Sequence, residues 1–271
     1  VLLSYHGARP LINGNAVIVI TMFVLLALIS IRDGKDEAAG ILLALSTIKP
    51  QNVLLLVIFV LLWALFNKRT KIITYFLGSM FLLVGFATVL IPDWFGQDFR
   101  EILRYPSYNP PLSLGAAVAA KFGDVGQRLS FVITGILTAV LLAEWWIGRF
   151  AETKRFLWMA FLTIAISQWI GISTDPGNFI LLYPGFFFCL SMIDTRWKGK
   201  SKLFIGSLLG VLLIGLWALF LITAHRSYTL IQSSFMFLPM PMVSILLLYW
   251  VRWWSVKSNR INSFEGYDPL K

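Results

Sequence analysis

The sequence has little charge. Asp, Glu, Lys and Arg make up only 13% of its 271 residues, whereas 58% are hydrophobic. This excludes an ordinary soluble domain, in which about a quarter of the residues are charged. A chain that buries most of its surface in lipid must satisfy its backbone within helices or a closed barrel. Long apolar runs favour helices, so the composition predicts an all-α, polytopic integral membrane protein.

Cysteine and histidine are also scarce. The single cysteine, Cys189, excludes an internal disulfide and a cysteine metal site. The two histidines, His6 and His225, are isolated from each other in the sequence. We find no HExxH motif, Walker loop, GxSxG motif or Cys/His cluster with metal spacing. The sequence therefore predicts no metal and no cofactor.

The basic residues are distributed as in a membrane protein. A net charge of +10 is compatible with nucleic-acid binding, but these residues occur in short clusters between apolar runs. That distribution is typical of cytoplasmic loops. We interpret the charge as a topology signal and expect membrane lipids, rather than nucleic acid, as partners.

Apolar length predicts about nine transmembrane helices, two of them short. They cover residues 15–31, two short spans on either side of residues 49–51, and then 72–91, 128–148, 156–172, 178–193, 203–223 and 235–254. This register leaves 16 of the 23 lysines and arginines on one side, which is therefore expected to be cytoplasmic. The chain then starts outside and ends inside.

This topology predicts one transmembrane domain over residues 1–254 and a polar cytoplasmic tail over residues 255–271. An outer loop covers residues 92–127, and within it residues 112–122 are expected to lie flat at the interface. We expect a multi-pass protein of a bacterial plasma membrane. Because the chain opens on Val1 without a signal peptide, an N-terminal part is expected to precede it.

One charge interrupts the apolar sequence. Lys49 lies between apolar runs at residues 38–48 and 53–66, neither of which spans a bilayer comfortably. A lysine at this depth is costly unless it is paired or faces a wet cavity, which suggests a function. The alternative is that Lys49 extends its ammonium to the headgroups. The sequence leaves both interpretations open.

Several further cations are expected on the outer side, against the usual bias. They are Arg100, Arg104, Lys121, Arg128 and Arg226. Arginine binds phosphate with two hydrogen bonds and lysine binds it as a point charge, so this set suits an anionic lipid or lipid-linked substrate. Asp175, before Pro176, is either an ordinary turn residue or a polar wall of an outer cavity.

Four segments carry a family resemblance. Gly14-Asn15 opens a span, Ala39-Gly40 leads a short helix that runs into Lys49-Pro50-Gln51, and residues 109–113 and 173–184 follow. This order resembles the mannosyltransferase-like family of the C-superfamily (GT-C) glycosyltransferases, which use polyprenyl-phosphate sugars as donors. Asn15 departs from the family's usual glutamine, Asp175-Pro176 stands near its Ser-Pro, and Asn178 stands near its histidine.

The resemblance implies a GT-C-like fold and a platform for a lipid phosphate and an acceptor. It implies Lys49, Gln51, Arg100, Arg104 and Arg226 as contacts of the lipid phosphate. Asp175 and Asn178 are implied as the acceptor site or cavity wall. The family's catalytic carboxylate would lie upstream of Val1, so no catalytic residue is assigned.

Two functional hypotheses follow. The first is a membrane glycosyltransferase, or its C-terminal portion, that moves a sugar such as mannose from a polyprenyl-phosphate donor to a lipid or glycan acceptor on the outer face. The second is a catalytically inactive scaffold of the same origin that packs against other membrane subunits. The 11 tryptophans and 22 phenylalanines provide contact surface for such a scaffold.

Overall fold

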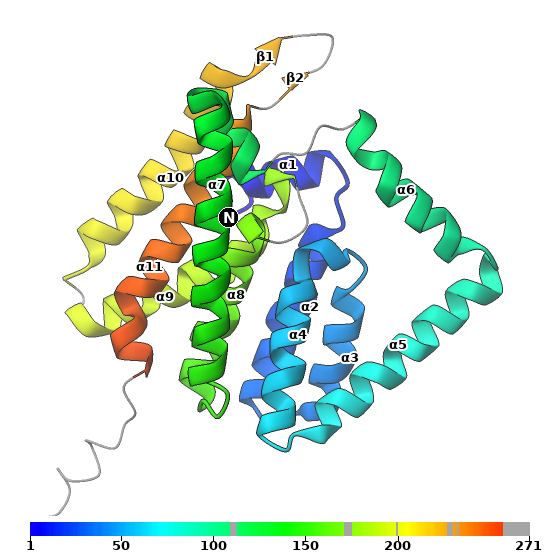
Figure 1. Ribbon diagram of the computed structural model, residues 1–271. Coiled ribbons are helices and arrows are strands. Elements are labelled where there is room, and N and C mark those ends of the chain that lie inside the picture. Colours follow the sequence, from blue (N-terminus) through cyan, green and yellow to red (C-terminus); the bar gives the residue numbers. More distant parts are fainter. Residues whose placement is uncertain (109–112, 171–174, 199, 227–229, 232, 257–271) are drawn as a thin grey trace, which may run out of the picture.

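The computed structural model describes residues 1–108, 113–170, 175–198, 200–226, 230, 231 and 233–256. This part is almost entirely helical, and its strands β1 (His225–Arg226) and β2 (Leu230–Ile231) form a short antiparallel pair. The first helices, seen in Figure 1, are α1 (Tyr5–Ile12), α2 (Val17–Arg32), α3 (Asp36–Ser46), α4 (Pro50–Phe66), α5 (Thr70–Leu90) and α6 (Trp94–Tyr108). They are followed by α7 (Leu114–Ile147), α8 (Thr153–Ile170), the 3-10 helix η1 (Pro176–Leu182), α9 (Tyr183–Trp197), α10 (Lys202–Thr223), the 3-10 helix η2 (Ser234–Phe237) and α11 (Pro239–Val256).

Helix α8 forms the centre of the bundle. All of its residues from Trp158 to Gln168 are buried, as expected of a helix surrounded by protein on every side. Helices α4, α7, α9 and α11 pack around it. The buried indole of Trp158 donates a hydrogen bond to the Leu248 carbonyl oxygen of α11, at 2.7 Å. The core is therefore formed by helices from both halves of the chain.

Helix α3 packs closely against both α2 and α5. At Gly40 an added Cβ would lie 2.5 Å from the Ile72 carbonyl oxygen of α5, closer than such atoms approach. Ala39 beside it is fully buried. The Ala-Gly pair of the sequence is therefore explained by close packing of two helices.

The structure confirms the prediction of a helical membrane protein. Five helical segments of the described part are long and apolar enough to cross a membrane: residues 70–90, 114–147, 176–197, 202–223 and 234–255. Helices α2 and α4 are also apolar but shorter. The count of nine spans stays a prediction, and so does the division into residues 1–254 and a tail, most of which lies outside the described residues.

The expected outer loop contains more helix than predicted. Residues 94–108 form α6, and α7 begins at Leu114, well before the expected span start. Gly123 has a φ of 55° and breaks the helix there. An added Cβ at Gly126 would lie 2.6 Å from the Val118 carbonyl oxygen, so the segment before Gly123 folds back along the segment after it. Figure 1 shows the short first part of α7, in green, beside the longer part that follows.

Candidate functional site

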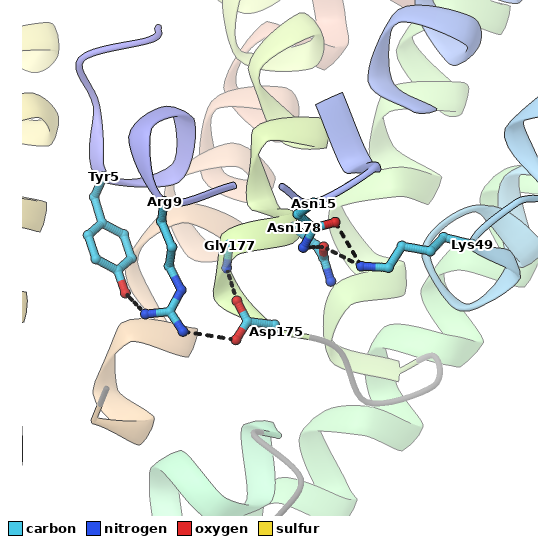
Figure 2. A network of polar contacts seen from close by, with 7 residues as sticks. All are labelled: Tyr5, Arg9, Asn15, Lys49, Asp175, Gly177 and Asn178. Carbon is cyan, nitrogen blue, oxygen red and sulfur yellow. Dashed lines mark hydrogen bonds and ion pairs between the residues drawn. The ribbon is translucent and has the colours of Figure 1, made fainter. Parts of the chain in front are cut away.

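Lys49 joins three elements of the bundle, as Figure 2 shows. It immediately precedes α4, where Pro50 occupies the first helical position and needs no hydrogen-bond partner for its nitrogen. Its Nζ donates to Oδ1 of Asn15 at 2.9 Å and to Oδ1 of Asn178 at 3.2 Å. Asn15 Nδ2 also donates to Asn178 Oδ1, at 3.2 Å. The ammonium is therefore held by two amide oxygens.

The backbone before α2 fixes the position of Asn15. Gly14 has a φ of 61°, a conformation that glycine adopts without strain. Oδ1 of Asn15 then accepts a hydrogen bond from the backbone nitrogen of Val17 at 3.1 Å, at the first residue of α2. The Gly-Asn pair therefore forms the turn that brings an amide to Lys49.

A buried 3-10 helix positions Asn178. All seven residues of η1 are buried, which is unusual for a connecting segment. Oδ1 of Asp175 accepts from the backbone nitrogen of Gly177 at 2.6 Å, and the Asp175 carbonyl oxygen accepts from the backbone nitrogen of Asn178 at 2.8 Å. The Asp175 side chain thus caps the helix that carries Asn178.

Arg9 of α1 contacts the same cap. Its Nη2 donates to Oδ2 of Asp175 at 3.3 Å and its Nη1 donates to the Tyr5 hydroxyl at 3.0 Å. The side chains of Arg9 and Asp175 are 22% and 36% exposed, so this ion pair lies at the edge of the protein. Burial raises the pKa of Tyr5 to about 12, so its hydroxyl stays protonated and accepts from Arg9 as a neutral group.

His6 lies on the buried side of α1. Burial lowers its pKa to about 3, which leaves the ring neutral. The ring packs at 5.2 Å from that of Tyr5 and 5.4 Å from that of Phe179, between centroids. It therefore acts as a core residue. No three His, Cys, Asp or Glu side chains gather at one point in the described part of the chain.

The hydrogen-bonded residues in Figure 2 form one polar cluster with an excess of positive charge. Its members are Tyr5, Arg9, Asn15, Lys49, Asp175, Gly177 and Asn178. Lys49 and Arg9 are its cations and Asp175 is its carboxylate. Asp175 contacts Arg9, whereas no carboxylate contacts the Lys49 ammonium within the described residues. Burial lowers the pKa of Lys49, and the nearby charge of Asp175 partly opposes that shift. A half-buried cation without a carboxylate partner is suited to bind an anion.

The predicted site residues divide into two groups. Lys49, Asp175 and Asn178 come together in this cluster. Gln51 lies in the first turn of α4 and makes no polar contact with the cluster in the described residues. Arg100 and Arg104 are exposed on α6, which stands apart from α1 and α4 in Figure 1. Arg226 lies in β1, and its side chain falls outside the described residues.

Arg9 and Tyr5 were not predicted from the sequence, and Asn15 was predicted only as a departure from a family motif. Arg9 lies 166 residues from Asp175 in the sequence. No local pattern marks that contact. Asn15 carried a signal, because an amide follows a glycine at the start of an apolar run.

In comparisons with known proteins, no family model, no curated protein and no solved structure matches the chain. The described part is that of a helical membrane protein with a cationic polar cluster where α2 and α4 begin.

Proposed function

We propose that this protein is a membrane glycosyltransferase that takes a sugar, with mannose as the first candidate, from a polyprenyl-phosphate donor on the outer face. Lys49 binds the phosphate of that donor. The observation that carries this proposal is the Lys49 ammonium, which is half-buried and held by two amide oxygens without a carboxylate. The order of the Gly-Asn, Ala-Gly and Lys-Pro motifs supports the glycosyltransferase assignment.

The geometry of Lys49 leaves room for a ligand contact. An ammonium has three N–H donors, of which the two asparagine oxygens accept two. The third is available to a phosphate oxygen. A charge-assisted hydrogen bond of this kind contributes about 1.5–3 kcal/mol. It also stabilises the negative charge that develops on the phosphate as the sugar leaves.

Asp175 and Asn178 have supporting roles in this proposal. Asn178 orients the lysine, and the partly exposed Asp175 carboxylate contacts the acceptor. A general base would have to accept a proton from the acceptor hydroxyl. Asp175 already accepts from Arg9 and Gly177, so we do not assign that step to it.

A second candidate function is a scaffold subunit that binds the lipid phosphate without chemistry. The contacts of Asp175 favour the scaffold. Within the described residues Asp175 is the carboxylate of the cluster, and it serves as the cap of η1 and the partner of Arg9. Such a scaffold would retain lipid binding and associate with other membrane subunits.

The proposal is tested with purified protein in lipid nanodiscs. Binding of polyprenyl phosphate and transfer from a radiolabelled polyprenyl-phosphate mannose are measured for the full-length protein, including any residues encoded upstream of Val1, and for its Lys49→Met and Lys71→Met variants. Lys71 is the matched control because its exposed ammonium pairs with Glu37 through helices α5 and α3, away from the cluster. We expect Lys49→Met to bind at least about 10-fold more weakly and Lys71→Met to bind normally.

The outcomes separate the two functions. Transfer that depends on Lys49 supports the enzyme, whereas binding without transfer supports the scaffold. Equal binding by all three proteins would overturn both, since Lys49 would then be a lysine that extends to the headgroups.

A further inference from the structure

Helix α6 has one apolar and one polar face. Phe95 and Phe99 are four residues apart, share one side of the helix and are 69% and 56% exposed. Gln97, Arg100 and Arg104 are also exposed. Phe95 and Arg104 are separated by about two and a half helical turns and therefore point in opposite directions. The exposed phenylalanines have no protein covering within the described part of the chain.

The corner between α5 and α6 fixes where α6 begins. The indole nitrogen of Trp94 donates to the Thr88 hydroxyl at 3.0 Å, and its backbone nitrogen donates to the Ile91 carbonyl oxygen at 3.0 Å. Gln97 Nε2 donates to Asp93 Oδ2 at 2.8 Å. These bonds hold α6 directly after α5, one of the five segments long and apolar enough to cross a membrane.

The end of α5 shows which medium surrounds this corner. Phe81, Phe86 and Val89 on α5 are 78%, 66% and 80% exposed, so this half of the helix faces lipid if α5 crosses the membrane. The apolar surface continues through the corner to Phe95. In Figure 1 α6 stands apart from the bundle and is connected to it through α5. The nearest apolar medium for Phe95 and Phe99 is therefore the boundary of the bilayer.

We infer that α6 lies in the membrane interface. Phe95 and Phe99 insert into the boundary between headgroups and acyl chains, and Arg100 and Arg104 contact lipid headgroups on the water side. Amphipathic helices with aromatic residues on one face bind membranes in this way. This assignment does not depend on the glycosyltransferase proposal. It gives the two arginines ordinary lipid headgroups as partners in place of the donor phosphate.

The charge of α6 indicates what drives its insertion. Arg100 and Arg104 are balanced by Asp98 and Glu101 on the same helix, so its net charge is zero. Long-range attraction to an anionic surface is therefore weak, and the apolar side chains provide the driving force. We expect the same insertion depth in phosphatidylcholine membranes with and without phosphatidylglycerol.

The test uses single cysteines that carry a nitroxide spin label on the full chain in vesicles. Positions 95, 97, 99 and 104 are substituted one at a time: Phe95→Cys, Gln97→Cys, Phe99→Cys and Arg104→Cys. Cys189 is buried, so the unmodified chain gives the labelling background. Accessibility of each label to oxygen, which concentrates in lipid, is compared with accessibility to a water-soluble nickel chelate.

We expect the ratio of oxygen to nickel accessibility to be several-fold higher at positions 95 and 99 than at 97 and 104, in both lipid compositions. Equal, high nickel accessibility at all four positions would place α6 in water and overturn the inference. Exclusion of both reagents at 95 and 99 would also overturn it, because that result means that protein covers these residues. Insertion only with phosphatidylglycerol would contradict the apolar driving force.

Discussion

The side chain of Asn15 makes two contacts through one oxygen atom. Oδ1 accepts from the backbone nitrogen of Val17 and from the Lys49 ammonium, at 3.1 and 2.9 Å. A carboxylate has nearly the same shape and accepts both bonds, but it adds a negative charge beside the ammonium. Asn15→Asp therefore adds a charge to the cluster, and it also removes the hydrogen bond that Asn15 Nδ2 donates to Asn178 Oδ1 at 3.2 Å.

We expect Asn15→Asp to fold normally and to bind polyprenyl phosphate at least about 10-fold more weakly, because the new ion pair neutralises Lys49. Titration calorimetry in nanodiscs gives the affinity, and thermal unfolding gives the stability. Asn15→Ala is the matched control, since it removes all three side-chain hydrogen bonds of Asn15, including the one to Asn178, without adding charge and should affect binding less. Normal affinity of Asn15→Asp would show that the Lys49 charge does not bind the ligand.

Raising the pH to deprotonate Lys49 should increase the stability of the fold and decrease the affinity for the ligand. Burial lowers its pKa in the folded chain below that of an ordinary lysine, about 10.4. Folding thus disfavours the charged form, so this destabilisation is fully present at neutral pH, declines as pH rises above the folded pKa and is gone above the pKa of the unfolded chain. Ligand binding needs the ammonium and is lost over the same range.

Affinity and thermal stability are therefore measured together from pH 7 to about 11, which covers the pKa of the unfolded chain. For the unmodified chain we expect affinity to fall by up to about tenfold per pH unit above the Lys49 pKa, with the Lys49 contribution to stability rising. Lys49→Arg is the control, because arginine stays charged throughout and its affinity should stay constant. A parallel fall of affinity in both proteins would assign the titration to another group.

The residues that form this site were only partly predictable from the sequence. Lys49 was predicted because it is a charged residue between two apolar runs. Gln51 was included because the family resemblance covers Lys49-Pro50-Gln51, but residues two positions apart at a helix start point in different directions. Arg9 was not found, because its partner Asp175 is brought to it by the packing of α1 against η1. Contacts between distant segments leave no local pattern.

At the scale of elements, one glycine permits the close packing of α3 on α5. An added Cβ at Gly40 would lie 2.5 Å from the Ile72 carbonyl oxygen and 2.8 Å from the Phe76 backbone nitrogen. Both atoms belong to a helix backbone, which yields less easily than a side chain. Gly40→Ala therefore forces the two helices apart.

We expect Gly40→Ala to destabilise the protein by about 1–3 kcal/mol, the usual cost of overpacking a core. Gly78→Ala on α5 is the matched control, because nothing lies within 4 Å of its added Cβ. It should be neutral or stabilise the helix by up to about 1 kcal/mol. Unfolding in detergent mixtures, followed by circular dichroism, measures both. Equal effects of the two substitutions would contradict the close contact at Gly40.

Helices were predictable from the sequence where apolar residues form long runs. The expected spans at residues 72–91 and 203–223 coincide with α5 and α10 within a few residues. Helix α6 was not predicted, because its apolar residues alternate with charges and resemble an exposed loop. The reversal of α7 was also not predicted, since a single glycine at position 123 differs little from the other glycines of the chain.

At the scale of the whole molecule, ion pairs connect the helices at the end opposite the Lys49 cluster. Asp36 of α3 pairs with Arg69 before α5, and Arg69 Nη1 also donates to the Ile31 carbonyl oxygen at 3.0 Å. Glu144 of α7 accepts from Arg252 of α11 at 2.9 and 3.1 Å. Asp36 and Glu144 thus hold two of the basic side chains, Arg69 and Arg252, in fixed positions. Arg69 and Arg252 therefore have a structural role at this end of the bundle.

The membrane orientation of α2 distinguishes a nine-span protein from one with five spans. Its 16 residues give a length of about 24 Å, less than the hydrocarbon core of about 30 Å. Asn13 and Lys35 are exposed at its two ends. If α2 crosses, we expect Asn13→Cys to react with an impermeant maleimide in intact cells and Lys35→Cys to react only after permeabilisation. Reaction of both in intact cells would show that α2 does not cross, and would leave Lys49 on the same side as Lys35 if α3 also fails to cross.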